Sequence, residues 1–150
     1  MKNAIVYYSK HHGNTKALID AIAEKYDVDC IDITEHPSPD LTPYDCIGFA
    51  SGIYYSKFHK SLLRLAKESL PEGVNTFFLY TYGAEKSGYT KAIADAVKEH
   101  RANILGEFGC FGWNTYGPFR LIGGLAKGHP DAADKANALA FYGVIESCCN

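Results

Sequence analysis

The sequence predicts a three-layer, doubly wound α/β fold, in which helices cover both faces of a five-stranded parallel sheet. Five short apolar segments alternate with segments whose apolar residues recur at helical spacing. The strand candidates at residues 4–8, 46–50 and 76–80 lack polar alternation, as expected of central strands buried on both faces. A length of 150 residues with 47% hydrophobic residues suits one domain, residues 1–150, with a sizeable core.

The elements follow one another in a regular order. The strands are expected at residues 4–8, 28–33, 46–50, 76–80 and 104–111, and the helices at 15–25, 59–70, 89–101 and 131–147. Pro37 and Pro39 make the connection between Ile33 and Asp45 a loop, with room for one helical turn. In the last helix we expect one stripe to pack on the sheet: Ala136, Leu139, Ala140, Gly143 and Val144.

Composition and charge exclude several classes of protein. A net charge of -2 and a pI near 6.3 give no basic footprint for nucleic acid. No apolar run approaches the roughly 20 residues that span a membrane. The N-terminus lacks a signal-peptide layout, so we expect a cytoplasmic protein.

The five cysteines show no metal-binding or thioredoxin-type spacing. Cys30, Cys46 and Cys110 lie in or beside strand-like runs and are expected to be buried thiols. Cys148 and Cys149 are expected at a frayed C-terminus.

The loop from Ser9 to Thr15 is the most informative segment, because it joins the first strand to a helix. Such a loop presents backbone N–H groups and the positive helix end to a phosphate. We expect phosphate contacts from Ser9, Asn14 and Thr15, which could equally cap the helix. Gly13 is expected to let the backbone approach a ligand closely or to adopt positive φ. His11 and His12 could add positive charge, and without a partner motif they predict no metal site.

Two further loops follow the strands at 46–50 and 76–80. In a doubly wound sheet, ligands bind beyond the carboxyl ends of the strands, so both loops should border the phosphate loop. They carry glycine, hydroxyl and aromatic residues that suit a flat ring with a phosphate tail: Ser51, Gly52, Ile53, Tyr54 and Tyr55, then Thr81, Tyr82, Gly83 and Tyr89. Trp113, after the last strand, could approach the same ligand or serve as a packing anchor.

These loops resemble those of the flavodoxin family. The segment Ser9–Thr15 is similar to that family's FMN-phosphate signature, Ser51–Lys60 has its small-then-aromatic order, and residues 106–130 resemble its C-terminal part. The resemblance implies FMN as cofactor and the strand order 2-1-3-4-5. It also implies that a peptide at Gly52 turns over with the redox state of the flavin. Two departures are the longer phosphate loop with His11 and His12, and a nearly neutral charge.

The resemblance implies an FMN-binding carrier that shuttles electrons between redox protein partners. The alternative is an FMN-dependent oxidoreductase that acts on a quinone or a similar small molecule. A regulatory α/β domain without flavin is a third class. We see no Ser-His-Asp arrangement, paired carboxylates or GxGxxG motif in a telling place, so no catalytic residue is predicted.

Overall fold

A computed structural model describes residues 1–10, 12–113 and 126–149. Its sheet has the strand order β2-β1-β3-β5-β6, with a short strand β4 paired to β3. The strands are β1 (Asn3–Tyr8), β2 (Asp29–Asp32), β3 (Cys46–Tyr54), β4 (Lys57–Phe58), β5 (Asn75–Tyr82) and β6 (Asn103–Phe111). The five strands of the main path run parallel. Apart from β4, this is the predicted order.

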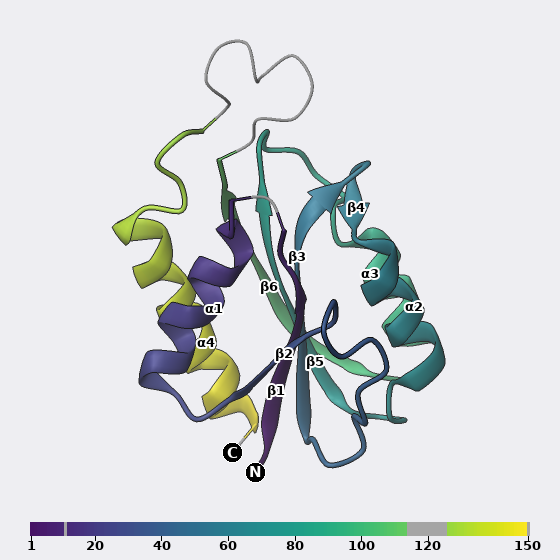
Figure 1. The fold of residues 1–150 in the computed structure, drawn as a ribbon. Coiled ribbons are helices and arrows are strands. Elements are labelled where there is room, and N and C mark those ends of the chain that lie inside the picture. The colour runs from purple at the N-terminus through teal and green to yellow at the C-terminus, as the bar shows by residue number, and fades with distance from the viewer. Residues whose placement is uncertain (11, 114–125, 150) are drawn as a thin grey trace.

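Helices cover both faces of the sheet and make three layers. They are α1 (Asn14–Lys25), α2 (Lys60–Ser69), α3 (Lys91–Lys98) and α4 (Ala132–Cys149). Figure 1 shows α1 and α4 side by side on one face and α2 and α3 on the other, and each pair is in contact. The connection between β2 and β3 contains no helix or strand, as its prolines predict.

The core divides between the two faces because successive strand side chains alternate. In β1, Ile5 and Tyr7 belong to the cluster beneath α1 and α4, whereas Val6 belongs to the cluster beneath α2 and α3. The first five residues of β1 are buried, as predicted for a central strand. Both faces of the sheet are therefore sealed, and the loops at the strand ends remain available for a ligand.

The β3–β4 hairpin is the main departure from the predicted elements. Strand β3 continues past residue 50, and Ile53 and Tyr54 pair antiparallel with Phe58 and Lys57. The two turn residues, Tyr55 and Ser56, have φ of 51° and 64°. Two-residue hairpin turns with positive φ normally use Asn-Gly or similar pairs, so Tyr-Ser gave no hairpin signal.

The packing stripe predicted for α4 is wrong at three of its five residues, whereas Leu139 packs against the core and Gly143 lies close to Tyr26. Ala136, Ala140 and Val144 are exposed, and the buried face of α4 consists of Ala138, Tyr142, Ile145 and Cys149. The ring of Tyr142 lies 5.0 Å from that of Tyr26 and 5.7 Å from that of Phe77. Its hydroxyl accepts a hydrogen bond from Asn3 Nδ2 at 3.3 Å. A tyrosine can be buried when its hydroxyl finds a partner, and simple apolar patterning misses this.

Two expectations for cysteines are also wrong. Cys149 is buried in the last turn of α4, beside Cys46, rather than frayed. Cys30 is exposed, because β2 is an edge strand of the sheet. Cys46 and Cys110 are buried as expected. No helix in the described ranges combines the length and apolarity that crossing a bilayer requires.

Candidate functional site

The loop between β1 and α1 wraps around the beginning of the helix. Gly13 has φ of 63°, in the left-handed region that favours glycine, as predicted. The Lys16 amide donates to Ser9 Oγ at 3.1 Å. Ser9 therefore caps α1 from the preceding loop. The amides of Asn14 and Thr15 lie in the first helical turn, where no carbonyl of the helix reaches them. This end of α1 offers N–H donors and a positive partial charge to an anion.

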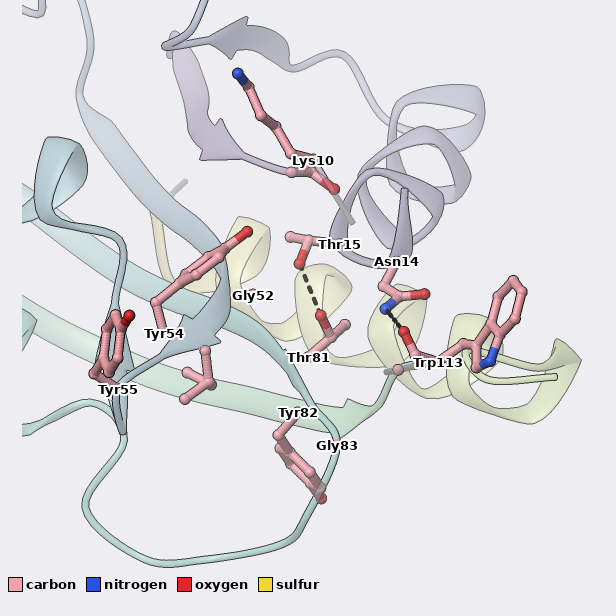
Figure 2. A pocket seen from close by; sticks show the side chains of 13 residues that line it. Lys10, Asn14, Thr15, Gly52, Tyr54, Tyr55, Thr81, Tyr82, Gly83 and Trp113 are labelled. Carbon is pink, nitrogen blue, oxygen red and sulfur yellow. Dashed lines mark hydrogen bonds between the residues drawn. The ribbon is translucent and has the colours of Figure 1, made fainter. Parts of the chain in front are cut away.

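Two buried threonines join α1 to the end of β5. The hydroxyls of Thr15 and Thr81 lie 2.9 Å apart, and both side chains are almost completely buried. Figure 2 shows this pair at the centre of a cavity. The pair fixes the first turn of the helix over the carboxyl end of the sheet.

On one side of the cavity, the residues after β6 are tied to α1. Asn14 Nδ2 donates to the Trp113 carbonyl at 2.8 Å, as Figure 2 shows. The Gly112 amide donates to the Tyr82 carbonyl at 2.8 Å. A Cβ on Gly112 would lie only 2.8 Å from Asn14 Nδ2, so glycine permits this close approach. The ring of His12 stacks on the indole of Trp113, with ring centres 3.8 Å apart.

On the opposite side, the β3–β4 hairpin carries Tyr54 and Tyr55 (Figure 2). The Tyr54 ring packs edge-on against Tyr8 and against His59, and His59 stacks flat on Tyr8 at 3.6 Å. The His59 amide donates to Ser51 Oγ at 3.1 Å, and the Ser51 hydroxyl donates to the Gly52 carbonyl. The rings of Tyr8, Tyr54 and His59 form an aromatic wall on this side of the cavity. These contacts link this aromatic wall to the Gly52 peptide.

The surroundings of Tyr54, Tyr82 and His59 favour the neutral forms of these side chains. Burial, with a smaller effect of the Tyr8 hydroxyl, raises the pKa of Tyr54 to about 12. Burial also raises the pKa of Tyr82, and the Glu85 carboxylate adds to it. Burial and the nearby Lys60 and Lys10 ammonium groups lower the pKa of His59.

Together these segments enclose a cavity of about 240 Å³ at the carboxyl end of the sheet. Its described lining combines hydroxyl and amide groups near α1 with aromatic residues of the β3–β4 hairpin and of the loops after β5 and β6: Ser9, Lys10, Asn14, Thr15, Gly52, Ile53, Tyr54, Tyr55, Thr81, Tyr82, Gly83, Gly112 and Trp113. This arrangement suits a flat aromatic ligand that carries an anionic group.

A family model described as a flavodoxin domain matches residues 5–117. The chain belongs to the flavodoxin family. An uncharacterised protein of Methanocaldococcus jannaschii is 40% identical over 144 residues, which cover 94% of this chain and 95% of that protein.

Solved structures of the same fold include both flavodoxins and an enzyme. An archaeal flavodoxin has a TM-score of 0.62 at 20% identity, covering 93% of this chain and 92% of that one. General stress protein 14 of Treponema denticola, in complex with FMN, has a TM-score of 0.63 at 12% identity, covering 97% and 99%. An NADPH-quinone reductase from P. pentosaceus has a TM-score of 0.61 at 11% identity, covering 95% of both chains. These likenesses show the flavodoxin fold.

The cavity brings together most of the residues that the sequence singled out. Eleven of the thirteen lining residues were predicted, and the exceptions are Lys10 and Gly112. Lys10 follows Ser9 directly, and its position in the phosphate loop is a signal that could have found it. Gly112 follows the last strand, and the loop-end rule applied to the other strands could have found it.

Four predicted residues lie outside this lining. Gly13 is the N-cap residue of α1, and the His12 ring stacks on Trp113. Ser51 is buried in the network beneath Gly52. Tyr89 is buried and donates to the Ala84 carbonyl at 2.6 Å, so it holds the loop after β5. His11, and the part of the predicted C-terminal resemblance at residues 114–125, fall outside the described residues.

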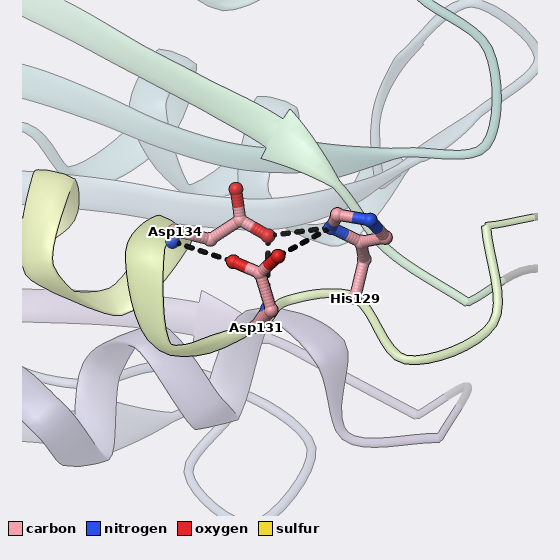
Figure 3. Close-up of side chains that lie close together, drawn as sticks. All are labelled: His129, Asp131 and Asp134. Carbon is pink, nitrogen blue, oxygen red and sulfur yellow. Dashed lines mark hydrogen bonds and ion pairs between the residues drawn. The ribbon is translucent and has the colours of Figure 1, made fainter.

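A separate polar cluster lies where α4 begins (Figure 3). Asp134 Oδ2 accepts from the Asp131 amide at 2.8 Å, and Asp131 Oδ1 accepts from the Asp134 amide at 2.9 Å. This reciprocal pair is a capping box. His129 Nδ1 lies 2.7 Å from Asp134 Oδ2 and 3.7 Å from Asp131 Oδ2. The capping box and the histidine contacts explain why these three side chains lie close together. They also anchor the segment at His129, whose carbonyl accepts a hydrogen bond from the Trp113 amide.

The His129–Asp134 contact predicts a pH-dependent contribution to stability. The hydrogen bond to Asp134 raises the pKa of His129 above its usual 6.5. The stabilisation is therefore complete below pH 6.5 and is lost as the pH rises through the folded-state pKa. We expect the difference in unfolding free energy between the wild type and His129→Gln to shrink as the pH rises from 6.5 through the folded-state pKa of His129. Urea denaturation at several pH values measures it, and a difference that grows with pH would contradict the assignment.

Proposed function

We propose that this protein binds FMN and carries electrons between redox proteins. The observation that carries the proposal is the cavity between the N-terminal end of α1 and the aromatic hairpin. Its α1 side offers first-turn amides and the Ser9 hydroxyl, which suit a phosphate. Tyr54 and Trp113, on opposite sides, suit a flat ring. When bound, the flavin supplies the electron chemistry, and the protein supplies binding and orientation.

The cavity is small for a mononucleotide. Its volume of about 240 Å³ is below the roughly 300–1,000 Å³ of most small-molecule pockets. A mononucleotide held here would keep one edge at the protein surface, where a partner protein can approach it. Family membership and the similarity to an archaeal flavodoxin support the same function.

The second candidate is an FMN-dependent oxidoreductase that acts on a quinone or a similar small molecule. It is favoured by the similarity to an NADPH-quinone reductase along 95% of both chains. The two candidates share the cofactor site and differ in whether a small electron acceptor is turned over.

One pair of measurements tests the cofactor and separates the candidates. The purified protein is titrated with FMN and riboflavin, and the visible spectrum is then followed during stepwise reduction. We expect tighter binding of FMN than of riboflavin, and two resolved one-electron steps for a carrier. Rapid NADPH consumption with a soluble quinone would identify the oxidoreductase instead. Failure to take up FMN would overturn both.

Gly52 offers a test of how the protein sets the reduction potentials. Its carbonyl accepts a hydrogen bond from the Ser51 hydroxyl, so this peptide has a defined orientation that can turn over at a glycine. A Cβ at Gly52 would lie 3.6 Å or more from the Tyr54 ring, so Gly52→Ala should fold normally. We expect the one-electron potentials of bound FMN to shift by about 20–45 mV, since alanine restricts the backbone by roughly 0.5–1 kcal/mol.

A redox titration of both proteins measures this shift. The affinity for oxidised FMN serves as the control and should change little. Identical one-electron potentials in the two proteins would contradict a role for the Gly52 peptide.

A further inference from the structure

Exposed lysines lie around the mouth of the cavity on three separate segments. Lys57 is in the β3–β4 hairpin, Lys86 is in the loop after β5, and Lys127 precedes α4. Lys86 Nζ lies 3.4 Å from Ser56 Oγ, so this lysine lies across the hairpin turn. Lys127 Nζ lies 5.7 Å from the ring centre of Trp113. Because the hairpin and Trp113 lie on opposite sides of the cavity, the lysines border it on both sides (Figure 2).

Within the described part of the chain, none of these three lysines forms an ion pair. The ion pairs of lysine and arginine there are made by Lys2, Lys16, Arg64, Lys91 and Arg101. Two of the nearby carboxylates, Asp131 and Asp134, are engaged with His129 and with each other. Glu85, next to Lys86, is exposed. With Lys10, which lines the cavity, the residues named here place four ammonium groups and three carboxylates around the mouth, although the whole chain carries a net charge of -2.

Tyr55 adds an exposed aromatic ring to the rim. Its side chain is 89% exposed, and its φ of 51° places a non-glycine residue in the left-handed region. Positive φ is what a two-residue hairpin turn requires, so this conformation places the ring at the tip of the β3–β4 hairpin. An exposed tyrosine beside lysines has the composition of a protein-binding hot spot with a charged periphery.

We propose that Tyr55, Lys57, Lys86 and Lys127 form a docking surface for an acidic electron-transfer protein. This surface, the lysine rim, would steer the negative face of the partner over the open side of the cavity. A macromolecule is favoured over a small anion because the lysines stand on separate segments on both sides of the mouth. Lys10 lines the cavity itself, so it is not counted as part of the docking surface. The electron transfer rests on the proposed function, whereas the docking does not.

A binding titration with charge-matched variants tests the lysine rim. The probe is labelled oxidised rubredoxin, an acidic iron protein, and a basic c-type cytochrome is the comparison. The rim variant is Lys57→Gln/Lys86→Gln/Lys127→Gln. The control variant is Lys25→Gln/Lys67→Gln/Lys98→Gln. It removes three exposed lysines from the last turns of α1, α2 and α3, which lie at the end of the sheet where the parallel strands begin.

We expect rubredoxin to bind more tightly than the cytochrome, and its affinity to fall about tenfold in the rim variant but less than twofold in the control. High salt should remove the difference between the wild type and the rim variant. Tyr55→Ser should weaken rubredoxin binding at every salt concentration. Preference for the cytochrome, or equal losses in both triple variants, would overturn the proposal. The titration is run with and without FMN, so failure of FMN binding leaves the docking result readable.

Discussion

Ser9→Asp is expected to weaken FMN binding by about 100-fold without destabilising the fold. The Ser9 hydroxyl accepts the Lys16 amide at the beginning of α1, and an aspartate carboxylate can accept the same hydrogen bond. A carboxylate here also favours the helix, by roughly 0.3–1 kcal/mol. The same charge repels a phosphate at that helix end, and a 100-fold loss corresponds to about 2.8 kcal/mol.

Riboflavin provides the control, because it carries no phosphate. Its affinity should be the same in the wild type and Ser9→Asp, whereas Ser9→Ala should affect FMN by less than tenfold. Fluorescence titration with both flavins measures the two affinities, and urea denaturation measures stability. Equal losses for FMN and riboflavin would show that the phosphate does not lie at this end of α1.

Tyr142→Ala is expected to lower the free energy of unfolding by about 3–5 kcal/mol, as for other buried aromatic residues. Tyr142 is fully buried between Tyr26 and Phe77, so its removal leaves a cavity between α4 and the sheet. Tyr142→Phe should cost about 1 kcal/mol, because only the hydrogen bond from Asn3 is lost.

Val144→Ala is the matched control, two residues away on the exposed face of α4, where the side chain is 61% exposed. It should change the free energy of unfolding by less than about 0.5 kcal/mol. Denaturant titrations of the three variants make the comparison. If Val144→Ala lowered the free energy of unfolding more than Tyr142→Ala, the assignment of the buried face of α4 would be wrong.

The apolar runs predicted the main strands, and the family resemblance implied their order. Strand and helix patterns alternate along the chain, and central strands such as β1 are apolar on both faces. The sequence did not show in the same way which face of α4 is buried. Its overall composition is apolar, and the burial of Tyr142 depends on other elements, through ring contacts with Tyr26 and Phe77 and a hydrogen bond from Asn3.

The sequence predicted which loops form the candidate site. It did not predict which of their side chains line the cavity and which are buried beneath it. Tyr54 and Tyr89 are both tyrosines that follow strands, yet one lines the cavity and the other supports a loop from beneath. Residue type and position cannot separate these two roles, because burial is set by neighbouring loops. The hairpin turn at Tyr55 and Ser56 was missed for a similar reason, since its positive φ values have no sequence signal.

The sequence by itself determined the alternation of strands and helices and the polar loop at the beginning of the first helix. Both are local properties, set by side-chain periodicity and by backbone preferences over a few residues. Only the tertiary structure decided that Thr15 meets Thr81, that Asn14 binds the Trp113 carbonyl, and that lysines from three segments surround one mouth. These contacts join residues far apart in the chain, and packing of the whole sheet brings them together.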